Sequence, residues 1–87
     1  ASKAGLRQLM MNRAGDLAPE IRVNCVAPGA IMAAPWEAEH FASVIEKVPL
    51  GRGGSPGDVA NAVSFLVRST YLSGQVIEVD GGWSVAP

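Results

Sequence analysis

Histidine and cysteine, two side chains that often bind zinc or take part in catalysis, occur once each in this 87-residue sequence. His40 and Cys25 are the only histidine and the only cysteine, so a Cys/His zinc cluster and an internal disulfide framework are both excluded. We interpret His40 as a surface or partly buried histidine. Cys25 alternates with Ile21 and Val23 and is interpreted as a core thiol. Lys3, taken alone, would be a solvated helix lysine, and we expect no metal site.

Two glycine-containing segments could bring main-chain groups close to a ligand. Pro28-Gly29-Ala30-Ile31 follows a strand pattern, and open α/β sheets bind ligands at the carboxyl ends of their strands. Glycine permits close approach of the backbone, and the amides after it are free to donate; a simple Pro-Gly turn is the alternative. The segment 51–57 follows no strand and lacks a Lys-Ser/Thr ending, so we expect no phosphate loop there.

Composition narrows the class of protein. Hydrophobic residues make up 48% of the chain and charged residues 17%, which is too apolar for a disordered protein. The formal net charge of -1 is atypical of nucleic-acid binders, which normally carry a basic stripe. No apolar run approaches the roughly 20 residues that cross a bilayer, and no signal peptide opens the sequence. We therefore expect a cytoplasmic protein without nucleic-acid or membrane partners.

Apolar periodicity predicts three helices. The first runs from near residue 1 to Leu17 or Ala18, where Pro19 stops it. A second, short helix is expected over 36–47. The third follows Ser55, with Asp58 completing a capping box, and ends near 68–70. The predicted core stripes are Leu6, Leu9, Met10, Ala14 and Leu17 on the first helix and Val59, Val63, Leu66 and Val67 on the third.

Two β-branched segments, Ile21–Val26 and Gln75–Val79, predict strands. Because helices lie between them, the connection is a crossover, which joins parallel strands in a right-handed sense. Two parallel strands alone leave the sheet edges uncovered. We therefore expect an α/β fold that is the C-terminal part of a doubly wound, Rossmann-type parallel sheet, incomplete without upstream strands. The helical pattern that is already under way at residue 1 favours the downstream part of a longer protein.

Four motifs stand out along the chain: Ala1-Ser2-Lys3-Ala4-Gly5-Leu6, Ile21-Arg22-Val23-Asn24-Cys25-Val26-Ala27-Pro28-Gly29, Pro49-Leu50-Gly51-Arg52, and Ser73-Gly74-Gln75 through Val79-Asp80-Gly81-Gly82. In type, order and spacing they resemble the short-chain dehydrogenase/reductase family, and the resemblance covers the whole chain. It implies that residues 1–87 are the C-terminal third of such an enzyme, within a single Rossmann-type NAD(P)-binding domain.

Lys3 then resembles the lysine of the family's Tyr-x-x-x-Lys motif, in which residues four apart share one helix face. The resemblance implies that its ammonium hydrogen-bonds the nicotinamide ribose and lowers the pKa of the tyrosine, the general acid or base. That tyrosine, the family's serine and the Gly-rich phosphate turn would all precede residue 1. Tyr71 cannot replace the tyrosine, because Gln75 stands four residues later.

The loop after the first strand also acquires implied roles. Many family members have a threonine two residues beyond the Ile31 position, and here Ala33 stands there, so that cofactor contact is in doubt. Met32 and Trp36 lie in the segment that covers substrate in the family, with plain packing as the alternative. The nicotinamide carboxamide would be bound by main-chain groups of Pro28, Gly29, Ala30 and Ile31.

The substrate class is suggested by the segment between Gly29 and Leu50, which resembles bacterial pteridine reductases. The resemblance implies hydride transfer from NADPH, favoured over NADH, to a pterin or carbonyl substrate in a homotetramer. The runner-up is a 3-oxoacyl-carrier-protein reductase or another carbonyl reductase. A non-catalytic, structural or oligomer-forming member of the family is the alternative from another class.

Overall fold

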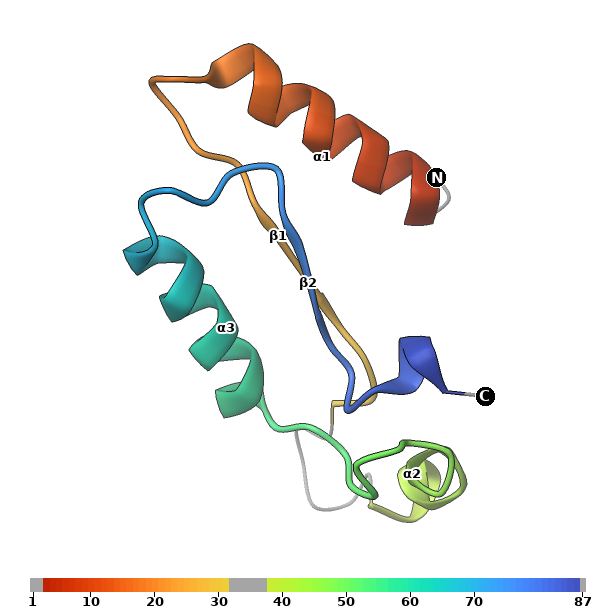
Figure 1. Cartoon of the computed structure of the whole chain (residues 1–87). Coiled ribbons are helices and arrows are strands. Elements are labelled where there is room, and N and C mark those ends of the chain that lie inside the picture. Colours follow the sequence, from red (N-terminus) through yellow and green to blue (C-terminus); the bar gives the residue numbers. More distant parts are fainter. Residues whose placement is uncertain (1–2, 32–37, 87) are drawn as a thin grey trace.

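The structure, a computed structural model, describes residues 3–31 and 38–86. The predicted helices are confirmed, although the second is shorter than expected: Trp36 and Glu37 lie outside the described residues, and Glu46 and Lys47 already form a turn. Along the chain the elements of Figure 1 are α1 (Lys3–Leu17), β1 (Cys25–Pro28), α2 (Ala38–Ile45), α3 (Pro56–Arg68), β2 (Val76–Val79) and a 3-10 turn (Trp83–Val85).

The two strands pair in parallel, as the crossover argument predicts. Cys25 lies opposite Val76 and Pro28 opposite Val79. The ladder continues by one hydrogen bond beyond the last pair, from the Gly29 amide to the Val79 carbonyl at 2.9 Å. Helices α1 and α3 lie on opposite sides of the strand pair (Figure 1), which is the layering of a doubly wound α/β sheet.

The first strand begins later than predicted, at Cys25 instead of Ile21. The Ile21 amide instead donates to the Leu17 carbonyl at the end of α1, at 2.9 Å. The Asn24 side chain forms hydrogen bonds with backbone groups of the segment before β2. Its Nδ2 donates to the Leu72 carbonyl at 2.9 Å, and its Oδ1 accepts from the Gln75 amide at 3.0 Å. Regular pairing therefore starts only after Asn24.

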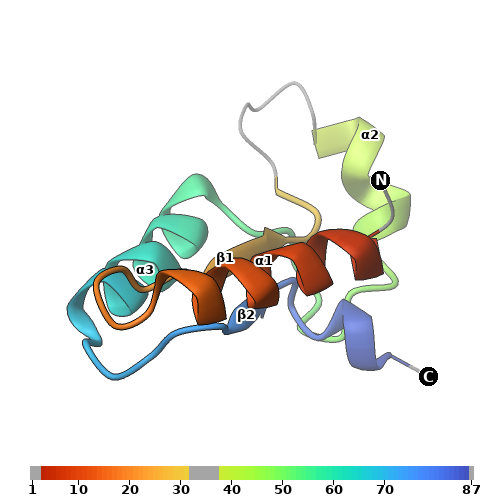
Figure 2. The same cartoon turned by 90° about the horizontal axis from the view of Figure 1, so that it is seen from above.

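Helix α1 runs antiparallel to β2. Near its start, Arg7 pairs with Glu78 in the second half of β2 at 3.4 Å. Further along, a Cβ at Gly74, which precedes β2, would lie 3.7 Å from the Ala14 Cβ. The first turn of α1 therefore lies toward the carboxyl ends of the strands, and Figure 2 shows α1 extending along the strand pair.

Helix α3 begins with the predicted capping box. The Ser55 side chain accepts from the Asp58 amide at 3.2 Å, the Asp58 carboxylate accepts from the Ser55 amide at 2.8 Å, and Pro56 occupies the first helical position. The Arg52 guanidinium adds an ion pair with Asp58 at 3.1 Å. These contacts satisfy amides that would otherwise have no partner in the first turn.

The core is smaller than the apolar stripes predict. Among the described residues only Ala14, Val48 and Leu66 are buried hydrophobic residues, and Leu6 is 57% and Val67 67% exposed. The prediction that Cys25 is a core thiol is wrong for this chain, since its side chain is exposed. The reason is that a two-stranded sheet has too few neighbouring elements to cover the faces of its helices and strands.

Arg22 joins the lead-in of β1 to the carboxyl end of α3. Its guanidinium donates to four carbonyl oxygens at 2.9 to 3.2 Å, those of Leu66, Val67, Ser69 and Leu72. The last carbonyls of a helix have no intrahelical partner and carry the negative end of the helix dipole, so a cation there is favourable. Arg22 thus acts as a C-terminal cap supplied from a distant part of the chain.

Just beyond the carboxyl ends of the strands, Gly29 and Asp80 lie close together. A Cβ at Gly29 would lie 2.7 Å from the Asp80 Cβ and 2.8 Å from its Cα. Only glycine fits at position 29 without a shift of the backbone.

Within the described residues, no helix is long and apolar enough to cross a membrane.

Arg22→Met should lower the free energy of unfolding by about 1–3 kcal/mol, because it removes charge-assisted hydrogen bonds to helix carbonyls. Urea unfolding of the protein that carries this chain measures the change. Arg13→Met, at an exposed position of α1, is the matched control and should change stability by less than about 0.5 kcal/mol. Equal effects of the two substitutions would contradict the capping role.

Gly29→Ala should destabilise the fold by about 1–3 kcal/mol, because its methyl group would overlap Asp80. The control is Gly15→Ala in α1, where an added Cβ meets nothing within 4 Å. That substitution should stabilise by about 0.5–1 kcal/mol through helix propensity. Thermal unfolding of both variants provides the measurement, and a stable Gly29→Ala variant would refute the close approach.

The hydrogen bond from the Ser55 amide holds the pKa of Asp58 below its usual value, and the side-chain bonds from Arg52 and Ser55 act in the same direction. A depressed folded-state pKa stabilises the fold above the unfolded value of about 3.9, and this stabilisation is lost as the pH falls through the folded value. The stability difference between wild type and Asp58→Asn should therefore shrink on acidification below about pH 4. Urea unfolding at a series of pH values tests this, and a difference that grows would contradict it.

Candidate functional site

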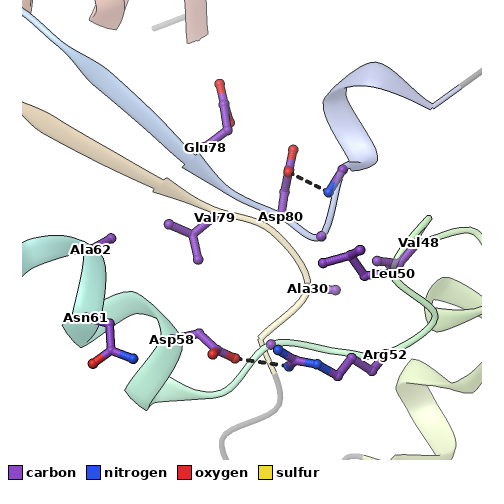
Figure 3. A pocket seen from close by; sticks show the side chains of 13 residues that line it. Ala30, Val48, Leu50, Arg52, Asp58, Asn61, Ala62, Glu78, Val79 and Asp80 are labelled. Carbon is purple, nitrogen blue, oxygen red and sulfur yellow. Dashed lines mark hydrogen bonds and ion pairs between the residues drawn. The ribbon is translucent and has the colours of Figure 1, made fainter.

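A cavity of about 470 Å³ opens beyond the carboxyl ends of the strands (Figure 3). Its walls come from the end of β2, the loop that leads into α3, and the first turns of α3. The residue from the loop after β1 is Ala30. This is the edge at which an open α/β sheet binds its ligands. The lining residues are Ala30, Val48, Leu50, Arg52, Gly54, Asp58, Asn61, Ala62, Glu78, Val79, Asp80, Gly81 and Gly82.

Charged side chains around this cavity already have partners within the chain. Arg52 pairs with Asp58 at 3.1 Å (Figure 3), and Asp58 also accepts from the Ser55 amide. Asp80 accepts from the Gly82 amide at 3.0 Å. The charge of Arg52 is thus neutralised within the chain, and the predicted Ser55 cap is confirmed.

The predicted cofactor-binding loop lies just beyond the carboxyl end of β1. Pro28 ends β1, Gly29 and Ala30 follow it, and Ile31 forms an isolated parallel bridge with Gly54. The Ala30 carbonyl accepts from the Gly54 amide at 2.9 Å. The loop is thus tied on one side to β2 and on the other to the segment before α3.

Gly29 packs closely against the residue that follows β2. Its amide donates to Val79, and the space where a side chain would stand is filled by Asp80. The need for glycine at this position therefore comes from packing between the strand ends. The amides of Ala30 and Ile31 donate no hydrogen bond to any described residue, so both can donate to an acceptor, and their predicted bonds to a nicotinamide carboxamide stay a prediction.

Lys3 is the first residue of α1, and its backbone lies toward the same edge of the sheet. Arg7, one turn later, pairs with Glu78, which lies opposite Ala27 in the strand register. Because α1 runs antiparallel to β2, Lys3 is further toward the carboxyl ends than Arg7 is. The start of α1 and the loop after β1 thus belong to one region of the molecule.

The remaining sequence predictions concern the substrate segment, Tyr71 and metal binding. Met32, Ala33 and Trp36 lie outside the described residues, so their predicted roles stay predictions. Tyr71 is fully exposed in the loop before β2. No group of three or more His, Cys, Asp or Glu side chains in 3–31 and 38–86 is arranged to hold a metal ion.

Sequence reasoning missed the role of Asp80 at this edge. Its side chain accepts from the Gly82 and Ser84 amides, at 3.0 and 2.9 Å, and its backbone packs against Gly29. The Asp-Gly-Gly turn was visible in the sequence. Its contact with the loop after β1 was not, because the two are some fifty residues apart.

Comparison with known proteins shows what this arrangement is similar to. A family model described as enoyl-(acyl carrier protein) reductase matches residues 1–84. The 3-oxoacyl-[acyl-carrier-protein] reductase FabG of Aquifex aeolicus is 45% identical over 87 residues, with 93% of this chain and 35% of that protein covered. The chain thus spans about a third of the length of the curated relatives it matches.

Two solved structures extend the comparison. FolM alternative dihydrofolate reductase 1 from Brucella canis, complexed with NADP, is 32% identical, with a TM-score of 0.86 over 99% of this chain and 35% of that chain. A short chain dehydrogenase from Leptospira borgpetersenii with bound NAD+ is 40% identical, with a TM-score of 0.80 over 94% of this chain and 33% of that chain. Sequence and structure agree that this chain belongs to the short-chain dehydrogenase/reductase family.

Proposed function

We propose that this chain supplies the C-terminal segment of a Rossmann-type NAD(P)-binding domain in an oxidoreductase that transfers hydride to a C=O or C=N bond. The observation that supports this most directly is the meeting of two features at one edge of the sheet. The start of α1, with Lys3, and the loop from Pro28 to Ile31 both lie toward the carboxyl ends of the strands.

A bound nicotinamide cofactor would supply the hydride. Around it, the Lys3 ammonium would hydrogen-bond the ribose and lower the pKa of a tyrosine in the rest of the protein, which then exchanges a proton with the substrate. Main-chain groups from Pro28 to Ile31 would hold the carboxamide and so fix which face of the ring meets the substrate. The Ala30 and Ile31 amides are the donors best suited to this.

NADPH is the cofactor that we propose. The FolM structure was solved with NADP and resembles this chain over nearly its whole length. The Leptospira dehydrogenase binds NAD+, so the choice depends on residues outside this chain. A cytoplasmic homotetramer is the state that we propose for the complete protein, from its composition and family.

Two substrate classes rest on different observations. A dihydropterin is favoured by the resemblance of the segment between Gly29 and Leu50 to pteridine reductases and by the likeness to FolM. In that case Met32 and Trp36 would contact the flat ring. A 3-oxoacyl thioester or related ketone is favoured by the identity with FabG. Both reactions would use the same cofactor-binding residues. The comparison of substrates therefore tests the substrate class, whereas substitution of Lys3 tests the site.

Lys3→Met in the complete protein should lower kcat about 10²- to 10⁴-fold, because it removes the cation that tunes the proton donor. The assay follows NADPH oxidation at 340 nm, with dihydropterin and an acetoacetyl thioester compared as substrates. Arg13→Met, on the same helix, is the control and should keep full activity. A wild-type protein that oxidises NADPH with neither substrate would overturn the substrate proposal, and a fully active Lys3→Met variant would overturn the site.

A further inference from the structure

We propose that Asp80 is a positioning residue of this oxidoreductase: it fixes the loop after β1 relative to the segment that follows α2. The inference rests on the proposed function, because that function gives the two segments their roles. Asp80 directly follows β2, and three separate parts of the chain meet there.

The first contact is with the loop that is proposed to hold the nicotinamide. The Asp80 backbone fills the space beside Gly29, where a Cβ would lie 2.8 Å from the Asp80 Cα. The Gly29 amide donates to the carbonyl of Val79, the residue just before Asp80, at 2.9 Å. A shift of Asp80 therefore moves the start of the Pro28–Ile31 loop with it, because close-packed backbones have no space to absorb the movement.

The second contact is made by the carboxylate. One oxygen, Oδ1, accepts from the Gly82 amide at 3.0 Å, as the dashed line in Figure 3 shows. The other, Oδ2, accepts from the Ser84 amide at 2.9 Å. Bonds to an ionised acceptor are stronger than neutral ones. They stabilise a turn in which Gly81 and Gly82 both have positive φ, at 64° and 93°.

The third contact is made by this turn with the segment after α2. The Leu50 amide donates to the Gly81 carbonyl at 3.0 Å. Added Cβ atoms at Gly81 and Gly82 would lie 2.5 Å from the Val48 Cγ1 and 3.2 Å from the Pro49 Cβ. Val48 is among the buried residues of the chain. The turn stabilised by Asp80 therefore packs directly against residues 48–50, which follow α2.

Together these contacts form a bridge between two functional segments. On one side is the loop proposed to seat the nicotinamide, and on the other are the 48–50 segment and α2, which follows in sequence the residues proposed to contact substrate. Through its bonds to the Gly82 and Ser84 amides, Asp80 would act on bound ligands by way of the turn. Misplacement of reacting groups by about 1 Å can cost 10²-fold in rate, so small shifts at Asp80 would matter for ligand binding.

The test compares Asp80→Ala with Asp80→Asn in the complete protein. Asp80→Ala removes both acceptor oxygens, whereas Asp80→Asn keeps one of them. Asp16→Ala, at an exposed carboxylate of α1, is the control. Asp80→Asn provides the readings if the alanine variant does not fold.

The first measurement is hydrogen exchange without ligands. Asp80→Ala should increase exchange about tenfold or more at the Gly29 amide of segment 28–31 and at the Leu50 amide of segment 48–50, because their acceptors, the Val79 and Gly81 carbonyls, flank Asp80, while the middle of α1 stays unchanged. Asp80→Asn should give a smaller increase in the same segments. Unchanged exchange in either segment, or an increase spread evenly over the chain, would overturn the bridge.

The second measurement is steady-state kinetics. The KM values for NADPH and for the substrate should both rise about tenfold in Asp80→Ala, with an intermediate rise in Asp80→Asn. The pH profile of kcat should keep its wild-type midpoint, since the proton donor is untouched. A fall in kcat at unchanged KM would indicate only a loss of folded enzyme and would overturn the positioning role.

The two proposals fail in different ways. If wild type lacks NADPH-dependent activity, the proposed function is wrong, and the exchange experiment still decides whether Asp80 links the two segments. If wild type is active and both Asp80 variants keep wild-type KM values and exchange, the positioning role alone is wrong.

Discussion

The parallel pairing of β1 with β2 is the interaction on which the rest of this structure depends. It joins residues about fifty positions apart, so loop closure must be compensated by contacts that the crossover itself supplies. The crossover returns through α3, and Arg22 then ties the carboxyl end of that helix to the lead-in of β1. The capping box at Ser55 orders the other end. Both ends of α3 are therefore held by polar contacts, with few buried side chains between them.

The pairing also determines where chemistry can take place. Parallel strands deliver their carboxyl ends to one edge, and the helices antiparallel to them deliver their amino ends to the same edge. In this chain that edge collects the start of α1, the loop after β1, the start of α3 and the turn after β2. The positive ends of the α1 and α3 dipoles lie toward the same region, and at α3 the Asp58 carboxylate already occupies the first turn.

Close packing at this edge explains the glycines. Gly29 is required by Asp80, and Gly81 and Gly82 are required both by their positive φ angles and by the segment after α2. An isolated loop would tolerate other residue types at Gly29. In the folded chain all three positions require glycine, because three segments pack into the same small volume. The same packing makes the turn after β2 a means of transmitting movement from one loop to the other.

Local chemistry let the sequence by itself determine a good part of this protein. Helix limits at Pro19 and Ser55, the capping box and the parallel crossover depend on neighbouring residues or on chain connectivity, and they were predicted correctly. The motifs also pointed to the family. The roles of Lys3 and of the Pro28–Ile31 loop came from that resemblance and stay predictions.

Only the tertiary structure decided the features that depend on distant partners. Asn24 delays the start of β1 because its side chain meets Leu72 and Gln75, which no local pattern indicates. Cys25 is exposed because a strand's periodicity shows which residues share a face, not whether anything covers that face. Gly29 serves packing because Asp80 arrives beside it from the other strand. For Asn24 and Gly29 the deciding contact spans some fifty residues and exists only once the two strands have paired.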